Sequence, residues 1–197
     1  MFLENTINSK SQTGWIEIIC GSMFSGKTEE LIRRLRRAQL AKQRIKVFKP
    51  TLDIRYQEDQ INTHNQWFLE AISVDSPKEI PVRVEDCEVV GIDEAQFFDE
   101  SIVEICNLLA NQGKRVIVAG LDMDFRGRPF GSMPNLMAIA EYVTKVRAIC
   151  AKTGALANYS HRITTNQHLI DLGEKDKYEP LSRSEFWKIL DLEKRKK

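Results

Sequence analysis

Short apolar runs alternate with longer amphipathic stretches along most of this chain. The runs have the length of buried strands and lie at 15–20, 44–49, 87–93, 115–122 and 145–150, with a further candidate at 67–74. Between them, apolar residues recur at helical spacing in three stretches, 28–41, 100–111 and 134–142. Strands that alternate with helices predict an α/β fold, with a mostly parallel sheet covered by helices on both faces.

Composition divides the chain into three expected parts. Residues 1–13 are polar and predict a flexible N-terminal tail, and residues 14–148 carry the alternating pattern. Residues 149–197 are polar and weakly periodic until about Tyr178, and a closing helix is expected from about Arg183. We therefore predict a main α/β domain followed by a small C-terminal lobe. The polar segments 51–65 and 125–131 are predicted loops.

The turn after the first expected strand carries a phosphate-binding motif. Residues 21–28 read GSMFSGKT and fit GxxxxGK[ST] at every fixed position, between an expected strand and an expected helix. The two glycines permit unusual backbone angles, so that successive N–H groups can surround phosphate oxygens. The lysine is expected to reach the terminal phosphates and the threonine hydroxyl to ligate Mg²⁺. We expect all eight residues to bind ATP: Gly21, Ser22, Met23, Phe24, Ser25, Gly26, Lys27 and Thr28.

Two adjacent carboxylates end the apolar run at 87–93. In an enzyme with a phosphate loop, an aspartate at such a strand end holds the magnesium shell, and this is the role expected of Asp93. Glu94 points to the other side of the strand and could accept a proton from an attacking hydroxyl or water. A solvated acid at a strand end is the alternative for Glu94. These residues alone leave open whether ATP is hydrolysed or its phosphate is transferred.

Net charge and cysteine spacing narrow the partners and the cellular location that we expect for this protein. The net charge is +1, so the whole chain is not marked for a nucleic-acid or membrane partner. No apolar run approaches the ~20 residues of a membrane span, and the start of the chain lacks a secretion signal. The four cysteines are widely spaced, which favours a reduced, cytoplasmic protein. Four arginines at 33, 34, 36 and 37 could bind nucleic acid, but their leucine-rich helix favours a solvated or subunit-contact face.

Five segments resemble one enzyme family in the same order. They are CGSMFSGKTEELIRRLRR, FKPTLDIRY, GIDEAQFF, AGLDMDFRGRPFG and DKY, and the resemblance to cytosolic-type (type II) thymidine kinases, bacterial members included, runs from about Gly14 to Trp187. It implies a RecA-like phosphate-loop domain and a small lobe whose lasso loop covers the nucleoside. The implied reaction transfers the γ-phosphate of ATP to the 5′-hydroxyl of thymidine with Mg²⁺, in nucleotide salvage for DNA synthesis. It also implies a homo-oligomer, usually a tetramer, and feedback inhibition by dTTP.

The resemblance also implies roles for individual residues. Glu94 would take the proton from the 5′-hydroxyl, and Asp93 and Gln96 would meet the phosphates and magnesium. The residues that would contact the nucleoside are Met23, Phe97, Leu121 and Phe125 at the thymine, Tyr178 at the sugar, Ser160 with the stretch Leu169–Gly173 at the base, and Asp53 and Arg55 in a nearby loop. The residues themselves leave open that Phe97 and Phe125 are ordinary core and that Asp53 and Arg55 form a solvated ion pair.

One expected feature of the family is missing. Many relatives hold a structural zinc in the small lobe with two Cys-x-x-Cys-like pairs, but here the first pair keeps only Cys150, with Thr153 in the second place. The second pair aligns with Ser182 and Glu185. Because structural zinc takes four thiolate or imidazole ligands, we predict no zinc. His161 and His168 have no usual ligand spacing and are expected to be surface histidines. An apolar cluster of Leu181, Phe186 and Trp187 is the predicted replacement.

Two other functions share part of these signals. A RecA-like ATPase acting on DNA would have the same fold and both acidic and phosphate-loop motifs, but it should also carry a basic or aromatic DNA surface. A nucleotide sensor without activity would keep the fold, but it should lack one of Lys27, Thr28, Asp93 or Glu94, all of which are present.

Overall fold

A six-stranded sheet forms the centre of the computed structural model, which describes residues 14–52, 60–62, 68–164 and 177–194. The strand order is β5-β2-β6-β7-β1-β8, and every neighbouring pair is parallel. The strands are β1 (Trp15–Gly21), β2 (Ile45–Pro50), β5 (Ile72–Val74), β6 (Val89–Ile92), β7 (Arg115–Leu121) and β8 (Tyr142–Lys145). The predicted α/β fold with a mostly parallel sheet is confirmed.

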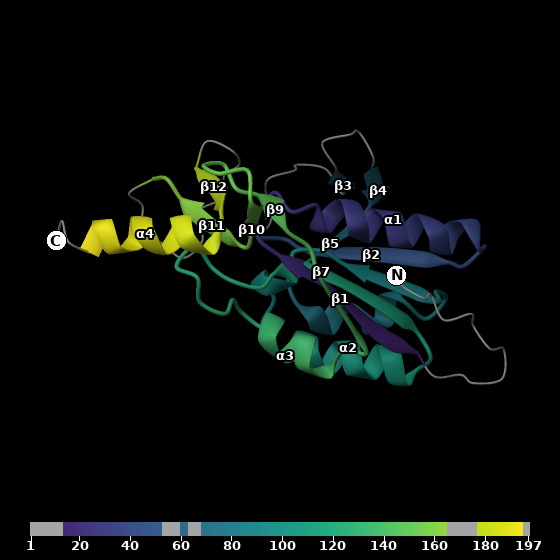
Figure 1. Ribbon diagram of the computed structural model, residues 1–197. Coiled ribbons are helices and arrows are strands. Elements are labelled where there is room, and N and C mark those ends of the chain that lie inside the picture. The colour runs from purple at the N-terminus through teal and green to yellow at the C-terminus, as the bar shows by residue number, and fades with distance from the viewer. Residues whose placement is uncertain (1–13, 53–59, 63–67, 165–176, 195–197) are drawn as a thin grey trace.

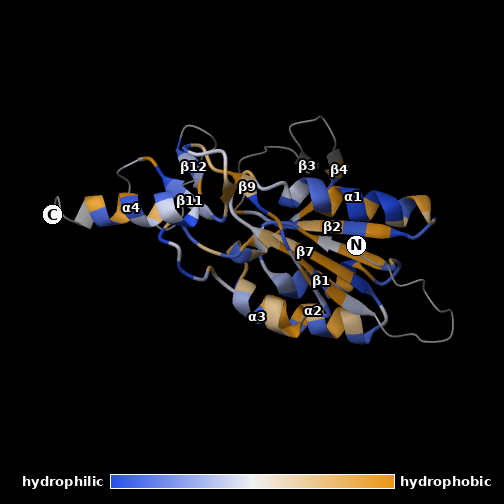
Figure 2. Cartoon of the chain, viewed as in Figure 1, coloured by the Kyte–Doolittle hydropathy of each residue, from blue (hydrophilic) through white to orange (hydrophobic). Residues whose placement is uncertain are grey.

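Helices cover both faces of the sheet (Figure 1). Helix α1 (Lys27–Leu40) lies on one face, and α2 (Ser101–Asn111) and α3 (Met133–Ile139) lie on the other. Each face therefore has its own apolar core, one around Leu31 and Leu35 of α1 and one around Ile102 and Leu136. Figure 2 shows the apolar central strands between helices of mixed character. Burial of apolar strand and helix faces against each other is the main stabilising force of this arrangement.

Shorter elements complete the main domain and the lobe. Beside the large sheet, β3 (Gln60–Asn62) pairs with β4 (Phe68–Glu70), and three 3₁₀ turns lie at η1 (Pro77–Glu79), η2 (Pro81–Arg83) and η3 (Ala95–Phe97). In the lobe, β9 (Ala148–Ile149) pairs with β10 (Leu156–Ala157), and β11 (Tyr159–Arg162) pairs with β12 (Tyr178–Leu181). Helix α4 (Arg183–Lys194) follows, where a closing helix was expected.

Several predicted boundaries differ from the structure. The helix expected at 134–142 ends at Ile139, and Tyr142 already begins β8, since its aromatic and β-branched residues favour a strand paired with β1. The strand expected at 145–150 is consequently two short strands, β8 and β9. The expected loop 51–65 contains β3, and the expected strand 67–74 is broken between β4 and β5, with its first residue outside the described part.

The lobe has a small core separate from the other two. Its buried residues are Ala148, Cys150, Ala157, Tyr159, Leu181 and Phe186. The rings of Tyr159 and Phe186 stack with centroids 4.4 Å apart, and Trp187 lies 41% exposed against the edge of Phe186. Such ring pairs stabilise beyond their buried area. This core also includes Ala148, which precedes the expected boundary, so the division of the chain at residue 149 stays a prediction.

A buried ion network lies between α1 and the sheet. Arg34 of α1 is 1% exposed and donates through Nη1 to Glu17 Oε2 of β1 at 2.8 Å. Its other nitrogens donate to Glu30 at 2.8 Å and to Thr144 at 2.9 Å. Arg115 of β7 also pairs with Glu17, at 2.6 Å. The prediction of a solvated or subunit-contact face is therefore wrong for Arg34.

Two further observations concern the cysteines and the length of the helices. All four cysteines are buried and free. Within the described ranges, no helix has both the length and the apolar character that crossing a membrane requires.

Candidate active site

The phosphate loop joins β1 to α1, the context that its motif requires. Gly26, which precedes the helix, has φ 83°, in the left-handed region that glycine adopts easily. Phe24 has φ 63° and shares this unusual conformation without being glycine. A non-glycine residue in this region is uncommon and marks a constrained backbone.

Side chains of the loop are held by the loop itself. Lys27 is 8% exposed, and its Nζ donates to the Ser22 carbonyl oxygen at 2.8 Å. Ser25 Oγ donates to the same carbonyl at 2.7 Å. The lysine ammonium is thus positioned in the loop at the N-terminus of α1, where backbone N–H groups and the helix dipole favour an anion.

Thr28 and Asp93 meet beside this loop. Thr28 Oγ1 donates to Asp93 Oδ2 at 3.1 Å, and the Glu94 N–H donates to Asp93 Oδ1 at 2.9 Å. Asp93 is 4% exposed. A hydroxyl and a carboxylate are hard oxygen ligands of the kind that Mg²⁺ uses beside nucleotide phosphates. The residues present therefore fit a magnesium ion bound together with ATP.

Glu94 is held in place by Gln96. Its backbone is left-handed, with φ 51°, and its Oε2 accepts a hydrogen bond from Gln96 Nε2. Gln96 Oε1 in turn accepts from the Leu121 N–H at 2.9 Å. Two glycines leave the space for Gln96: a Cβ on Gly120 would lie 2.8 Å from Gln96 Oε1, and one on Gly131 would overlap the Gln96 carbonyl oxygen. This chain of contacts links the tips of β6 and β7.

The lobe contacts the phosphate loop directly. The Met23 N–H donates to Ser160 Oγ of β11 at 2.9 Å, and Ser22 Oγ donates to the Ala157 carbonyl at 3.4 Å. The residues are more than 130 positions apart in the sequence. Sequence reasoning placed Met23 and Ser160 at the nucleoside base but did not predict that they touch.

An arginine that the sequence did not single out joins two predicted nucleoside residues. Arg162 is 5% exposed, and its guanidinium lies 3.8 Å from the ring centroid of Phe125. Its Nε and Nη2 donate to the Tyr178 hydroxyl at 3.0 and 2.6 Å. Phe97, a third predicted nucleoside residue, packs edge-to-face on Phe130 with ring centroids 5.8 Å apart. Alternation along β11 from Ser160 was the only signal that could have pointed to Arg162.

Four of the predicted nucleoside residues lie outside the described part of the chain. They are Asp53, Arg55, Leu169 and Gly173. Their proposed roles therefore rest on the sequence resemblance. His168 also lies outside the described part. The expectation of a surface histidine is wrong for His161, which is 9% exposed and has its Nδ1 3.2 Å from Glu179 Oε1.

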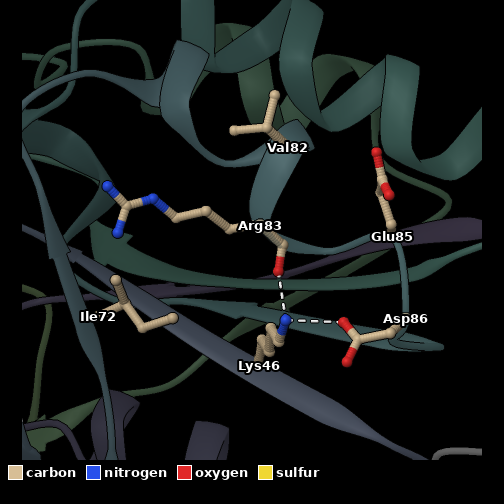
Figure 3. Close-up of a pocket in the computed structure, with 6 residues that line it drawn as sticks. All are labelled: Lys46, Ile72, Val82, Arg83, Glu85 and Asp86. Atoms are coloured by element: carbon tan, nitrogen blue, oxygen red, sulfur yellow. Dashed lines mark hydrogen bonds and ion pairs between the residues drawn. The ribbon is translucent and has the colours of Figure 1, made fainter.

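A cavity of about 480 Å³ lies at the other end of the sheet. Figure 3 shows Lys46 of β2 reaching across it to the Arg83 carbonyl at 2.5 Å and to Asp86 at 2.7 Å. Lys46 lies near the start of β2, whereas the phosphate loop follows the end of β1. In parallel α/β sheets ligands bind beyond the carboxyl ends of the strands, so we do not assign the reaction to this cavity.

Comparison with known proteins decides which family this site belongs to. The sequence model described as thymidine kinase matches residues 14–186. The chain belongs to the thymidine kinase family. It is 58% identical over 173 residues to a thymidine kinase of Rhodothermus sp. (strain ITI 518), covering 88% of this chain and 81% of the relative. It is 50% identical over 196 residues to a thymidine kinase of Bacteroides fragilis, covering 100% and 98%. The match gives no support to the DNA-dependent ATPase.

Cys150, the one cysteine that remains at the zinc position expected from the family resemblance, is a hydrogen-bonded thiol. Burial raises the pKa of Cys150, but hydrogen bonds from the Thr153 side chain and from backbone groups of Ser182, Lys152 and Thr153 outweigh it and lower the pKa to about 7. Among the described residues, no cluster of three or more histidine, cysteine or acidic side chains could hold a metal ion. The absence of zinc stays a prediction.

This thiol predicts a pH dependence of stability. Between pH 7 and the ordinary cysteine pKa of 9.0, the native state binds fewer protons than the unfolded state, so its stability should rise with pH in this window. The contribution should be absent below pH 7. Thermal unfolding midpoints of wild type and Cys150→Ser should therefore diverge from pH 7 to 9. Because the two proteins differ only at Cys150, their difference excludes any contribution from Cys20. Burial is the main cause that raises the pKa of Cys20 to about 11. Parallel curves would contradict the prediction.

Proposed function

We propose that this protein transfers the γ-phosphate of ATP to the 5′-hydroxyl of thymidine and forms dTMP. The observation that carries the proposal is the position of Glu94, next in sequence to the Asp93 that bonds to Thr28 of the phosphate loop. A proton acceptor beside a phosphate site suits attack by a hydroxyl group. The family match over residues 14–186 supports thymidine as the acceptor.

The residues of the phosphate loop would bind and orient ATP. Lys27 and the loop N–H groups neutralise charge on the phosphates, and catalysis in such enzymes is largely positioning and electrostatics. Thr28 and Asp93 would hold Mg²⁺, which when bound neutralises phosphate oxygens. Glu94 would accept the proton of the 5′-hydroxyl, with its carboxylate oriented by Gln96.

The nucleoside would lie between the loop and the lobe. Met23 and Ser160 bond to each other there, and Phe125 and Tyr178 are joined by Arg162. A flat base between apolar and aromatic side chains is a favourable arrangement. We propose that Phe97, Leu121, Asp53, Arg55 and the Leu169–Gly173 stretch complete this site, on the strength of the family resemblance.

Further features remain proposals drawn from the same resemblance and from composition. They are a homo-oligomer, most simply a tetramer, feedback inhibition by dTTP, a cytoplasmic location, no structural zinc and no nucleic-acid partner.

The proposal is tested by phosphate transfer from labelled ATP to each of the four deoxynucleosides. We expect product with thymidine, and none with deoxyadenosine, deoxyguanosine or deoxycytidine. ATP hydrolysis without transfer to any nucleoside would overturn the kinase proposal. Transfer to a purine nucleoside in preference to thymidine would overturn the substrate assignment.

A further inference from the structure

A second buried lysine lies close to the acidic end of β6. Lys49, near the end of β2, is only 2% exposed. Phe48 pairs with Ile92 in the parallel ladder, and the Asp93 N–H donates to the Phe48 carbonyl at 2.9 Å. The residues that follow this pair, Lys49 and Asp93, are therefore neighbours on adjacent strands. The phosphate-loop motif does not include Lys49, and the sequence analysis assigned it no role beyond the end of a strand and a place in the FKPTLDIRY segment.

Lys49 and Asp93 face the same side of the sheet. One pair earlier in the ladder, Val47 lies opposite Gly91. A Cβ on Gly91 would point toward α1, 2.8 Å from Leu35 Cδ1 and 3.4 Å from Val47 Cγ1. Side chains two residues apart on a strand point to the same face. Asp93 accordingly faces α1, as its bond to Thr28 shows, and Lys49 faces α1 beside it.

This arrangement places a buried lysine on the strand beside Asp93, the proposed magnesium ligand. Asp93 supplies a carboxylate at this point, where its Oδ2 accepts from Thr28 Oγ1 and its Oδ1 accepts from the Glu94 N–H. Lysine is almost never fully buried unless an opposite charge accompanies it. In a site that is shielded from water, a charge on a neighbouring strand changes the attraction between carboxylates and a divalent cation appreciably.

We infer that Lys49 sets the magnesium affinity of the nucleotide site, by neutralising part of the negative charge of Asp93. Lys49 is thus a positioning residue that acts through Asp93 and weakens the hold of the site on Mg²⁺. The inference rests on the proposed function, because it requires that Mg²⁺ binds here with the nucleotide.

The test measures equilibrium binding of a fluorescent ADP analogue as Mg²⁺ is added. Replacing Lys49 by Met or by Gln should lower the Mg²⁺ concentration for half-maximal enhancement about tenfold, because a neighbouring positive charge is removed. Lys49→Arg keeps the charge and should stay within about twofold of wild type. Lys46→Met is the matched control, since Lys46 lies on the same strand at the far cavity (Figure 3). It should also stay within about twofold.

Repeating the Lys49→Met change in the Asp93→Asn variant separates an effect that acts through Asp93 from one that does not. In Asp93→Asn, the Lys49→Met shift should shrink to less than about threefold, because the charge on which Lys49 acts is gone. An unchanged or increased Mg²⁺ requirement in folded Lys49→Met and Lys49→Gln would overturn the inference. Failure of both neutral variants to fold would assign Lys49 to stability alone and would also overturn it. Wild type that binds ADP without any response to Mg²⁺ would instead refute the magnesium part of the proposed function.

Discussion

Replacing Glu94 by Gln is expected to lower the kcat of phosphate transfer to thymidine about 10²–10⁴-fold, the usual contribution of a general base. The amide keeps the shape of the side chain and can still accept the hydrogen bond from Gln96, but it cannot take up the proton of the attacking hydroxyl. Steady-state kinetics should show the loss in kcat, while the KM for thymidine and the affinity for ADP stay within about threefold.

The matched control is Glu100→Gln. Glu100 lies six residues further on and is exposed at the start of α2, where its side chain makes no capping bond. Its replacement should leave kcat within about twofold of wild type, since exposed charges contribute little. A Glu94→Gln variant with near-normal kcat would show that another group accepts the proton.

Replacing Arg34 by Met is expected to reduce the free energy of unfolding by about 3 kcal/mol, because it leaves buried charge without its partner. Glu17 would lose one of its two arginines, and it is itself only 1% exposed. Urea unfolding followed by circular dichroism, at a fixed protein concentration, gives the change directly. The double variant Glu17→Gln/Arg34→Met should cost less than the two single changes together, because the residues share one network.

Arg33→Met provides the comparison for this prediction. Arg33 precedes Arg34 on α1, but its side chain is 46% exposed and pairs with Glu30 at the surface. Its loss should cost about 0.5 kcal/mol. If both substitutions reduced the free energy of unfolding by the same amount, burial would not be the cause of the effect expected at Arg34.

The sequence predicted the central strands and the first helix well, because each depends on local pattern. The run WIEIIC is a strand in nearly any context, and the spacing of Leu31, Leu35 and Ala38 defines the buried face of α1. The same spacing places Arg34 on that face, three residues after Leu31. A charged residue on that face, together with Glu17 within an apolar strand, is the pattern from which the buried pair could have been predicted, although we expected a solvated or subunit-contact face.

The candidate site could be predicted only where it is contiguous in the chain. The phosphate loop and the Asp93–Glu94 pair are short motifs with fixed spacing, so their residues were identifiable from the sequence. The bond between Met23 and Ser160 and the place of Arg162 between Phe125 and Tyr178 depend on how the lobe packs on the main domain. The place of Lys49 depends on strand order, which apolar runs do not specify.

Gln96 fits between two glycines, and this has a consequence for how the chain tolerates change. Neither Gly120 nor Gly131 carries a functional group, yet a Cβ on Gly131 would overlap the Gln96 backbone, and one on Gly120 would meet the ends of the Met133 and Gln96 side chains. In a population selected for activity, Gly131 should therefore be the less tolerant of the two, because its φ of 51° and its backbone contact leave no room for a side chain. Sequence variation between residues 120 and 131 would then be limited by the space around Gln96. Exposed residues of the same segment, such as Arg128, could vary freely.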